Sequence, residues 1–467
     1  MRGRTFLAAL MIQLLTRFSG YGADHPNFVV ILTDDQSWVG SSLQVIPEDA
    51  RTRSDYYQTP HIERLAEMGM CFTQGYSPAA SCCPTRRSIQ TGQTPARHEY
   101  HSDRDGWTAT YLRQLNIPRM LKSVHAGYQT AHFGKWDHRY DEVTPGQQGY
   151  DVSDGYTGNG TGGSKGTGGP AARPDPKRID TITGRALDFI SSQHASGNQF
   201  YLQVSHYAVH LDVFYNQATF DHIRRRPAGR KHRMPEFAAM TADMDASIGR
   251  ILDRLIELKL LKNTYLIFLS DNGGRNAIPK APKAKEARNA PLRDGKHSFY
   301  EGGIRVPYIV LGPGVKPGSV STVPVTGLDI LPTLADLAGY RRPLPESIDG
   351  GSMRPVLHHA GQGVIHRARP FLVFHQAVDR KAISAIRFGD LKLVKNWEKG
   401  RLELFDLSKD LSESHDISGR NPEQRRKLHA MLTGFLEEIG AATQQTAGKK
   451  QGTRSKRRQP DQIPRSW

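Results

Sequence analysis

Cysteine is scarce in this 467-residue chain, which holds only Cys71, Cys82 and Cys83. An odd count without framework spacing excludes a fold held together by several disulfides. A bridge between Cys82 and Cys83 would be strained, because neighbouring Cα atoms lie about 3.8 Å apart and disulfides usually need roughly 4.4 to 6.8 Å. One of these thiols is therefore a candidate for a role other than disulfide bonding.

Long apolar runs are missing as well. The run from Phe6 to Leu15 is shorter than the roughly 20 residues that a membrane-spanning helix needs, so we expect no transmembrane anchor. Arg2 and Arg4 precede this run and small residues follow it as far as Ala23, which is the pattern of a cleavable export signal. We predict a signal peptide over residues 1–23 and an exported protein, periplasmic or extracellular; the alternative is a buried first helix.

Acidic residues are in deficit, with 46 Asp and Glu against 63 Lys and Arg, and the formal net charge is +17. Part of the excess lies in a polar stretch without apolar periodicity, which predicts a disordered basic tail over residues 442–467. The remaining positive charge suits an anionic substrate. It would also suit nucleic acid, but the chain shows no known nucleic-acid module, so we expect no specific nucleic-acid partner.

The composition is that of a globular protein, with 37% hydrophobic and 23% charged residues. Short runs of branched residues alternate with stretches of helical period, which predicts an α/β fold with a large, mostly parallel sheet flanked by helices. Thr59 is expected to cap a helix with Pro60 in its first turn, and a longer helix is expected to bury a stripe from Phe237 to Leu258. The expected strands are Phe28 to Leu32, Phe200 to Val204, Tyr265 to Leu269 and Val306 to Leu311.

The chain beyond about Pro370 is predicted to form a smaller unit. Short apolar runs joined by turns at Gly389-Asp390 and Lys399-Gly400 indicate an antiparallel sheet, which a helix from about Pro422 to Ile439 would close. The expected strands are Phe371 to His375, Ile383 to Phe388, Leu391 to Lys395 and Leu402 to Leu407. We therefore expect a large α/β domain over residues 24–365 and a C-terminal subdomain over residues 366–441.

Glycine dominates the segment from Asp151 to Pro170. A phosphate-binding loop would need a strand before it and a helix directly after it, with a lysine and a hydroxyl in order. Those features are missing, so we predict a flexible surface loop.

Polar residues follow three of the expected strands. Asp34-Asp35, the histidines His206 and His210, and Asp271-Asn272 each come after a buried run. Ligands bind outside the carboxyl ends of the strands in an open parallel sheet. Neighbouring buried acids require a neutralising charge, and a set of carboxylates with one amide favours Ca²⁺ or Mg²⁺ over zinc. The alternative is that each pair caps the next helix or starts a turn.

The strongest signal lies between Tyr76 and Gly92. Cys82, Pro84 and Arg86, followed by Thr91-Gly92, stand in the order cysteine, any residue, proline, any residue, arginine and then threonine-glycine. This segment resembles the signature of the type I sulfatases of the alkaline phosphatase superfamily, in which a dedicated enzyme oxidises the cysteine to formylglycine. Thr85 stands where that family usually has serine or alanine. The resemblance runs from Pro26 to about Leu411 and includes Asp34-Asp35, Gly134-Lys135-Trp136, Ala208-Val209-His210, Ser270-Asp271-Asn272-Gly273, Gly295-Lys296 and Tyr300 to Pro307.

The resemblance implies hydrolysis of sulfate monoesters through a formylglycine made from Cys82 by a formylglycine-generating enzyme. It implies one divalent metal ion, Ca²⁺ in preference to Mg²⁺, held by Asp34, Asp35, Asp271, Asn272 and the modified Cys82. Arg86, Lys135 and Lys296 would neutralise the sulfate oxygens. His210 and Lys296 would protonate the departing alcohol oxygen.

One departure falls at a catalytic position. The family usually reads glycine-lysine-tryptophan-histidine, the histidine assisting sulfate release, whereas this chain reads Gly134-Lys135-Trp136-Asp137-His138. We expect His138 to take the role of base, because histidine titrates near neutral pH while the basicity of an aspartate near cations is depressed. The alternative is that Asp137 acts directly or that the step is impaired.

Two other functions remain open from the sequence. One is a phosphate or phosphonate ester hydrolase of the same superfamily, although ligands for only one ion are evident. The other is an inactive exported protein that binds polyanions. The substrate expected for a basic exported sulfatase is a sulfated carbohydrate or polysaccharide, but loops that one chain does not reveal would determine which.

Overall fold

The computed structural model describes residues 25–98, 107–138, 141–164, 169–278, 288–376, 382–441 and 443. The expected signal peptide and all but residue 443 of the expected basic tail lie outside these residues. Within the described ranges, no helix is both long enough and apolar enough to cross a membrane.

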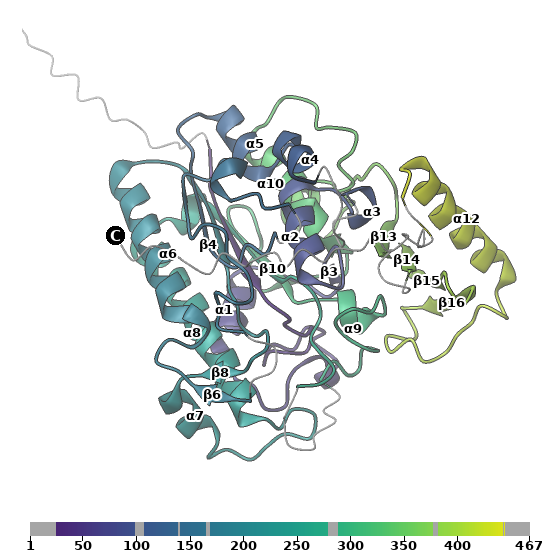
Figure 1. The fold of residues 1–467 in the computed structure, drawn as a ribbon, viewed down its shortest axis with the longest axis horizontal. Helices are drawn as coiled ribbons and strands as arrows, with labels where there is room; N and C mark the ends of the chain where they lie inside the picture. Colours follow the sequence, from purple (N-terminus) through teal and green to yellow (C-terminus); the bar gives the residue numbers. More distant parts are fainter. Residues whose placement is uncertain are drawn as a thin grey trace, which may run out of the picture.

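An eight-stranded sheet forms the centre of the protein (Figure 1). Its parallel pairs align the ends of neighbouring strands, with Leu32 beside Ser205 and Thr33 beside Ser270. Three of the four expected strands are confirmed to within a residue. The fourth starts at Tyr308, two residues later than expected, and runs antiparallel to β9. The strand order is β11 (Ser319–Ser321), β2 (Met70–Phe72), β10 (Tyr308–Leu311), β9 (Thr264–Ser270), β1 (Asn27–Thr33), β7 (Phe200–Ser205), β4 (Gln129–Gly134) and β5 (Val152–Ser153).

Helices cover both faces of this sheet, so its central strands are apolar on both sides. Along β1, Val29 and Ile31 belong to one core cluster and Phe28 and Val30 to the other. Figure 1 shows α6 and α8 on one side of the sheet and α5 and α10 on the other. These helices are α6 (Ile179–Ser196), α8 (Pro235–Glu257), α5 (Ile117–Val124) and α10 (Ile330–Ala338), and α1 (Pro60–Met68) lies on the side of α8.

The expected helix at Pro60 is present, but its cap differs from the prediction. Thr59 makes no side-chain cap and instead accepts a hydrogen bond from the backbone N–H of Ser42. The carboxylate of Asp245, on α8, accepts hydrogen bonds from the backbone N–H groups of His61 and Ile62. A residue distant in sequence therefore satisfies the first turn of α1.

The described part of the glycine-rich segment, residues 151–164 and 169–170, is more closely attached than the flexible surface loop expected from the sequence. Thr157 is buried, and its hydroxyl donates to the carbonyl of Gly134 at 2.6 Å and accepts from the backbone N–H of Trp136 at 2.9 Å. Gly162 lies against Tyr207, where a Cβ would come within 2.4 Å of the ring. This segment therefore supports the chain just after β4.

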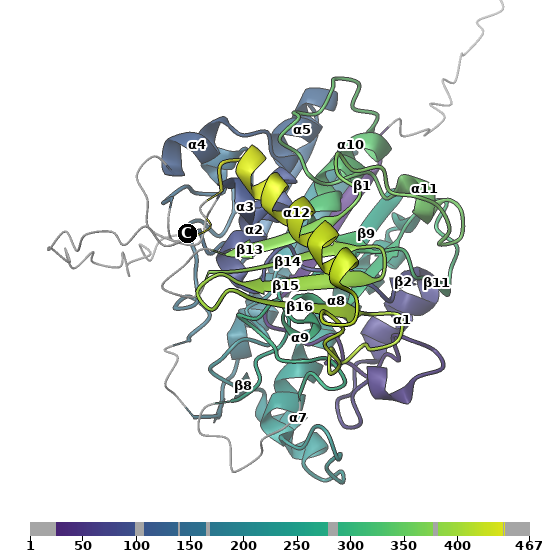
Figure 2. The ribbon, with the colours of Figure 1, turned by 90° about the vertical axis from the view of Figure 1, so that its right-hand side faces the viewer.

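The C-terminal unit has the predicted antiparallel sheet and closing helix. Figure 2 shows α12 lying across the sheet, where Leu428 and Leu432 pack against Ile386. On the opposite face, Phe374 belongs to a cluster with Phe299 of the large unit. The sheet is therefore held between α12 and the loops of the large unit. Its elements are β13 (Leu372–Gln376), β14 (Ile383–Phe388), β15 (Leu391–Asn396), β16 (Arg401–Asp406) and α12 (Pro422–Glu438).

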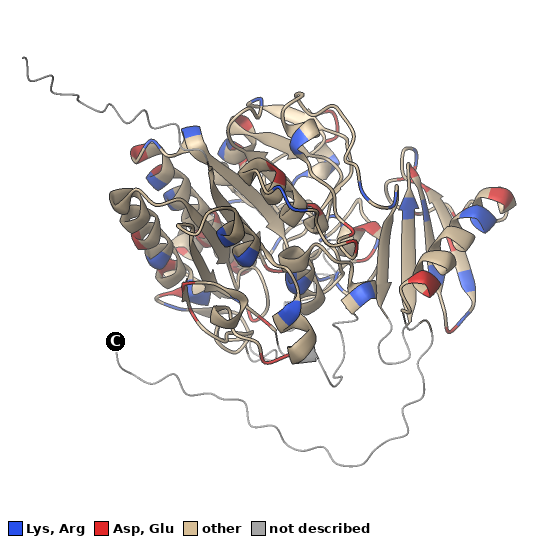
Figure 3. Cartoon of the chain, turned by 90° about the horizontal axis from the view of Figure 1, so that it is seen from above, with Lys and Arg blue, Asp and Glu red and all other residues tan. Residues whose placement is uncertain are grey.

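Figure 3 shows lysine and arginine interspersed with acidic residues over both units.

Short elements complete the described chain. The short helices are α2 (Cys82–Thr91), α3 (Pro95–His98), α4 (Trp107–Arg113), α7 (Gln217–Ile223), α9 (Glu301–Ile304) and α11 (Arg354–Leu357). The short strands are β3 (Gly75–Tyr76), β12 (Val325–Thr326), β6 (Ala171–Ala172) and β8 (Phe214–Tyr215), and the short 3-10 turns are η1 (Ala50–Thr52), η2 (Gly146–Gln148), η3 (Pro176–Arg178), η4 (Leu261–Asn263) and η5 (Gly327–Asp329).

Candidate active site

The aligned carboxyl ends of the central strands bring the candidate residues together. Asp34 follows β1, Lys135 follows β4 and Asp271 follows β9, each within one residue of the strand end. The backbone of Asp34 holds the chain after β7, because its N–H donates to Ala208 and its carbonyl accepts from Val209. Residues from four strands therefore meet at one edge of the sheet.

Cys82 is the first residue of α2 and lies at the middle of this group. Its sulfur is 3.5 Å from Asp34 Oδ1, and Lys296 Nζ is 3.1 Å from the same sulfur. Arg86 follows one helical turn later, on the same face of α2, and its Nη2 donates to Asp271 Oδ2 at 2.7 Å. The spacing of the motif thus directs a cysteine and an arginine toward one point.

Pro84 and Thr85 fit this helix start for separate reasons. Pro84 lies in the first turn, where a backbone N–H has no intrahelical partner to lose. The Thr85 hydroxyl lies 3.2 Å from both the N–H and the carbonyl oxygen of Ala79, and it is fully buried. Thr85 therefore fastens the preceding loop to α2, a contact that serine could also make and alanine could not.

Three buried acidic side chains pair with three buried cationic side chains in the cluster. Lys135 Nζ lies 2.6 Å from Asp34 Oδ2, Lys296 Nζ lies 2.5 Å from Asp35 Oδ1, and Arg86 binds Asp271. All six side chains are 4% exposed or less. Unpaired charges are costly in such a place, so the cluster depends on every partner.

These charges alter proton affinities in different directions. Burial alone would raise the pKa of Asp35, but the charges of Lys296, His210 and Lys135 together outweigh burial and lower it. Burial and the nearby Asp34 raise the pKa of Asp271 to about 6. Burial, with Asp271 and Asp34 near the sulfur, raises the pKa of the Cys82 thiol. Unmodified Cys82 therefore carries a protonated thiol at neutral pH.

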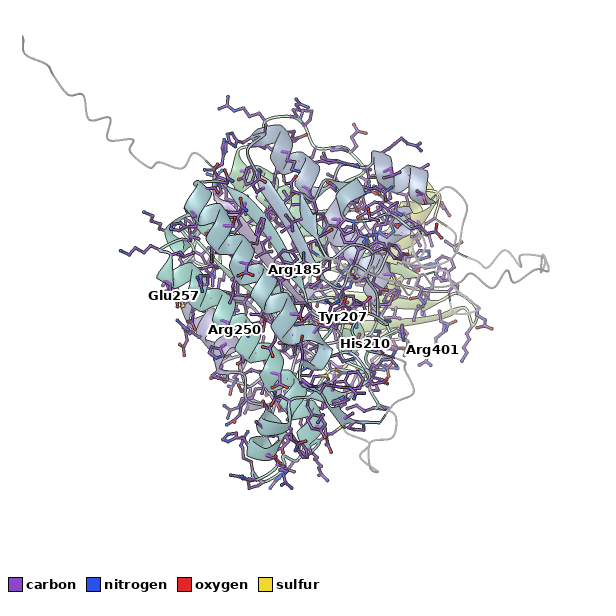
Figure 4. All side chains as sticks on the ribbon, turned by 60° about the vertical axis from the view of Figure 1, so that its left-hand side comes forward. Arg185, Tyr207, His210, Arg250, Glu257 and Arg401 are labelled. Atoms are coloured by element: carbon purple, nitrogen blue, oxygen red, sulfur yellow. The ribbon has the colours of Figure 1, made fainter. Side chains whose placement is uncertain are left out.

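His210 lies beside Asp35, with its Nε2 3.7 Å from Asp35 Oδ2. Its Nδ1 lies 2.6 Å from the carbonyl oxygen of Leu211, so this nitrogen is the donor and Nε2 faces the cluster. Burial lowers the pKa of His210 to about 4, so the ring is neutral at neutral pH. Figure 4 labels His210 next to Tyr207, near the start of α6.

The oxygen atoms of the cluster fit a divalent cation. Asp35 Oδ2 and Asn272 Oδ1 are buried and have no hydrogen-bond partner among the described residues. One potential ligand atom from each of Asp34, Asp35, Cys82 and His210 lies within 4.8 Å of the others. Asp271 differs from the expected ligand set, because its oxygens accept hydrogen bonds from Arg86 and from the backbone of Asp35.

The structure places His138 elsewhere than the sequence predicted. Its Nδ1 lies 3.2 Å from Asp141 Oδ2, and its ring stacks between Trp136, at a centroid distance of 4.2 Å, and Tyr111, at 4.9 Å. Asp137 points the other way: its Oδ2 lies 3.6 Å from Lys135 Nζ and accepts from Cys83 Sγ at 3.2 Å.

A left-handed backbone at Asp137 explains this exchange. Its φ is +57°, a value that non-glycine residues seldom adopt. The chain therefore turns where a regular strand would alternate its side chains. Asp35 has a φ of +60°, so two residues of the cluster hold a conformation that typically occurs at functional sites.

Two cationic residues near the cluster were not predicted from the sequence. Arg275 Nε lies 3.4 Å from Asp35 Oδ2, and Lys177 is buried within electrostatic reach of Asp34 and Asp35. Arg275 follows Asn272 by only three residues, so proximity along the chain could have indicated it. Nothing local distinguishes Lys177 from a surface lysine.

Comparisons with known proteins agree with this geometry. A family model described as Sulfatase matches residues 26–340, and one described as N-sulphoglucosamine sulphohydrolase, C-terminal, matches residues 294–441. The chain is 26% identical over 517 residues to a protein of Formosa agariphila named Sulfatase, covering 90% of each chain. It is 30% identical over 370 residues to the N-acetylgalactosamine-6-sulfatase of Sus scrofa, covering 71% of this chain and 66% of that protein.

The fold is similar to that of solved sulfatase structures. The crystal structure of Ps i-CgsB in complex with k-i-k-neocarrahexaose aligns with a TM-score of 0.72 and 22% identity, over 88% of this chain and 93% of that one. The Sulfatase model alone spans more than half of the sequence. The chain therefore belongs to the sulfatase family of the alkaline phosphatase superfamily and is a sulfuric ester hydrolase.

Proposed function

We propose that this enzyme hydrolyses sulfate monoesters of a sulfated carbohydrate and that residue 82 acts as formylglycine. The observation that carries the proposal is the position of Cys82, whose sulfur lies against both Asp34 and Lys296 at the edge of the sheet. A hydrated aldehyde there would offer two hydroxyls, one to attack sulfur and one whose deprotonation allows sulfate to leave. A formylglycine-generating enzyme would be required during maturation.

A divalent cation is the second part of the proposal. The ligands would be Asp34, Asp35, Asn272 and the modified Cys82, together with Asp271 through lone pairs that its hydrogen bonds from Arg86 and Asp35 leave free. This oxygen-rich set favours Ca²⁺ over Mg²⁺, and both over zinc. When bound, the ion would polarise the sulfate oxygens and offset their charge. The unpartnered oxygens of Asp35 and Asn272 support this assignment.

The buried cations would bind and orient the anionic substrate. Arg86 and Lys135 are held in place by Asp271 and Asp34, so their positive charges are already directed at the cluster before substrate arrives. Lys296, which contacts Cys82, would donate a proton to the departing oxygen. Neutral His210, with its proton on Nδ1, would accept a hydrogen bond through Nε2 from the alcohol once that is protonated, in place of the proton-donor role expected from the sequence.

Asp137 is the residue that we propose as the base for sulfate release, in place of His138. Its carboxylate contacts Lys135 and the residue next to Cys82, whereas His138 is held by Asp141 and by stacking. A carboxylate in this position would accept a hydroxyl proton from the modified residue 82. His138 would instead brace the loop that carries Asp137.

The carbohydrate substrate is supported by the relatives. Their names include N-acetylgalactosamine-6-sulfatase, and the aligned crystal structure contains k-i-k-neocarrahexaose. The excess of positive charge in the sequence suits polyanionic substrates. We further propose export after removal of residues 1–23, a catalytic domain over residues 24–365 and a C-terminal subdomain over residues 366–441 that supports the active-site loops.

A substrate panel tests the function. Enzyme produced together with a formylglycine-generating enzyme should release sulfate from sulfated saccharides and from a small aryl sulfate. Release of phosphate or phosphonate from matched esters at a higher rate than sulfate would contradict the proposal, as would binding of sulfated saccharides without any release.

A further inference from the structure

Lys177 is a buried lysine at the edge of the active site that the proposed reaction does not use. It lies in the turn η3, directly before α6, and its side chain is 2% exposed. Lys177 and Arg178 have φ values of +56° and +55°. Two successive left-handed residues with side chains are unfavourable unless the surroundings hold them. The turn therefore directs Lys177 inward at a cost in backbone conformation.

The ammonium of Lys177 has no carboxylate partner within ion-pair distance among the described residues. Its Nζ lies 4.9 Å from the centre of the Phe214 ring. Burial lowers the pKa of Lys177 to about 7, and the charges of Asp34 and Asp212 offset this only in part. A buried cation without a counter-ion is costly, so the position is ready to receive an anion.

The Lys177 side chain approaches the cluster from the side of His210. The nearby acids include Asp212, two residues after His210, as well as Asp34. In Figure 4 the labelled Tyr207 and His210 lie near the start of α6, and the charge of Arg178 acts on Tyr207. This is the side on which we place the departing alcohol, and Lys135, which would hold the sulfate being hydrolysed, also lies within electrostatic reach of Lys177.

Lys177 packs against a wall that is formed by Phe214, Arg173 and Gly163. The guanidinium of Arg173 lies 4.9 Å from the same Phe214 ring, so two cations flank one aromatic side chain. Gly163 packs against the same ring, because a Cβ at this position would come within 2.9 Å of Phe214. Lys177 and Arg173 thus place two positive charges beside Phe214, which suits a second anionic group.

We propose that Lys177 is a specificity residue that binds a second anion, a sulfate or a carboxylate, next to the sulfate ester being hydrolysed. The substrate class is then a saccharide with at least two negative charges close together. This inference rests on the proposed sulfatase reaction. It adds that the enzyme distinguishes multiply charged saccharides from singly charged ones through Lys177.

Equilibrium binding to a Cys82→Ala protein tests the proposal without depending on maturation or turnover. The probes are N-acetylgalactosamine 6-sulfate, its 4,6-disulfate, and the disaccharide of glucuronate linked to N-acetylgalactosamine 6-sulfate. The double variant Cys82→Ala/Lys177→Met should bind one or both doubly charged probes about 10- to 100-fold more weakly than Cys82→Ala alone. This is the loss expected for one charge-assisted hydrogen bond. Binding of the singly charged probe should stay within about twofold.

The two doubly charged probes identify the anion, since loss with the disulfate alone assigns a sulfate and loss with the uronate alone assigns a carboxylate. Lys177→Arg should retain most of the affinity, and the exposed Lys262→Met should change nothing. Equal effects of Lys177→Met on all three probes, or no effect on any, would overturn the inference.

Turnover by the mature enzyme provides the second readout. Of the two doubly charged saccharides, the one that binds wild-type Lys177 protein more tightly should show a raised KM in Lys177→Met. The kcat/KM for an aryl sulfate should stay unchanged. A wild-type enzyme that hydrolyses no sulfate ester would refute the proposed function. An active wild type whose selectivity is unchanged in Lys177→Met would refute only the role of Lys177.

Discussion

Lys296 Nζ lies 3.1 Å from the sulfur of Cys82 and contacts Asp35 at the same time. This ammonium therefore joins the proposed nucleophile to a proposed metal ligand. Burial alone would lower the pKa of Lys296, but the carboxylates of Asp35 and Asp34 raise it. Lys296 thus holds its proton at neutral pH, directly beside the position where a leaving oxygen must be protonated.

Replacing Lys296 with methionine should lower kcat/KM by about 10²- to 10³-fold, because one positive charge at the reacting group is lost. Steady-state kinetics with a small aryl sulfate measure the effect. The exposed Lys262→Met serves as the matched lysine control and should behave as wild type. Activity of Lys296→Met within about twofold of wild type would remove Lys296 from the reaction.

Metal binding should depend on Asp35. In the wild type, added Ca²⁺ should raise the melting temperature, because an ion that binds only the folded state stabilises it. Asp35→Asn should lose this increase and contain less metal by elemental analysis. Asp253→Asn, which removes an acid from a partly exposed ion pair with Arg64, is the control. Normal metal content in Asp35→Asn would contradict the site.

Asp137→Asn should impair sulfate release more than His138→Asn does. We expect Asp137→Asn to show an initial burst of alcohol product followed by slow turnover, measured by rapid mixing. His138→Asn should keep steady turnover and lose thermal stability, because its buried contacts with Asp141 and Trp136 are altered. The reverse pattern would restore His138 as the base.

Asp245 should make stability depend on pH. Burial raises the pKa of Asp245 to about 7 in the folded state, against about 4 when unfolded. Between these values the folded state binds a proton that the unfolded state does not, so this contribution to stability is lost as pH rises from about 4 to about 7. The depressed pKa of a buried histidine such as His206 acts in the opposite sense.

A comparison with Asp245→Asn isolates this effect. The melting temperature of the variant relative to wild type should increase as pH rises from about 5 to about 7. Parallel melting curves over that interval would show that Asp245 does not titrate there.

The sequence predicted the elements whose burial is evident locally. Strands β1, β7 and β9 are apolar runs buried on both faces. The stripe expected from Phe237 to Leu258 is buried through Leu255, whereas Leu258 follows the end of α8 and is only partly buried. The direction of β10 was not predictable, because a short apolar run reads the same in either orientation.

Predictions that depended on distant packing were weaker. Thr59 was a reasonable cap, but Asp245 from another helix reaches the same turn. The left-handed backbone at Asp137 exchanges the expected positions of two neighbouring side chains, and no local pattern announces it. The burial of Lys177 depends on Phe214, which lies 37 residues away in the sequence.

The central claim is that residue 82 performs the reaction as formylglycine. Mass spectrometry of the peptide containing residue 82, from enzyme produced with a formylglycine-generating enzyme, tests it most directly when turnover is measured on the same samples. We predict an aldehyde at residue 82, intact thiols at Cys71 and Cys83, and activity proportional to the aldehyde fraction. Full activity from protein whose Cys82 remains a thiol, or from Cys82→Ala, would contradict the account.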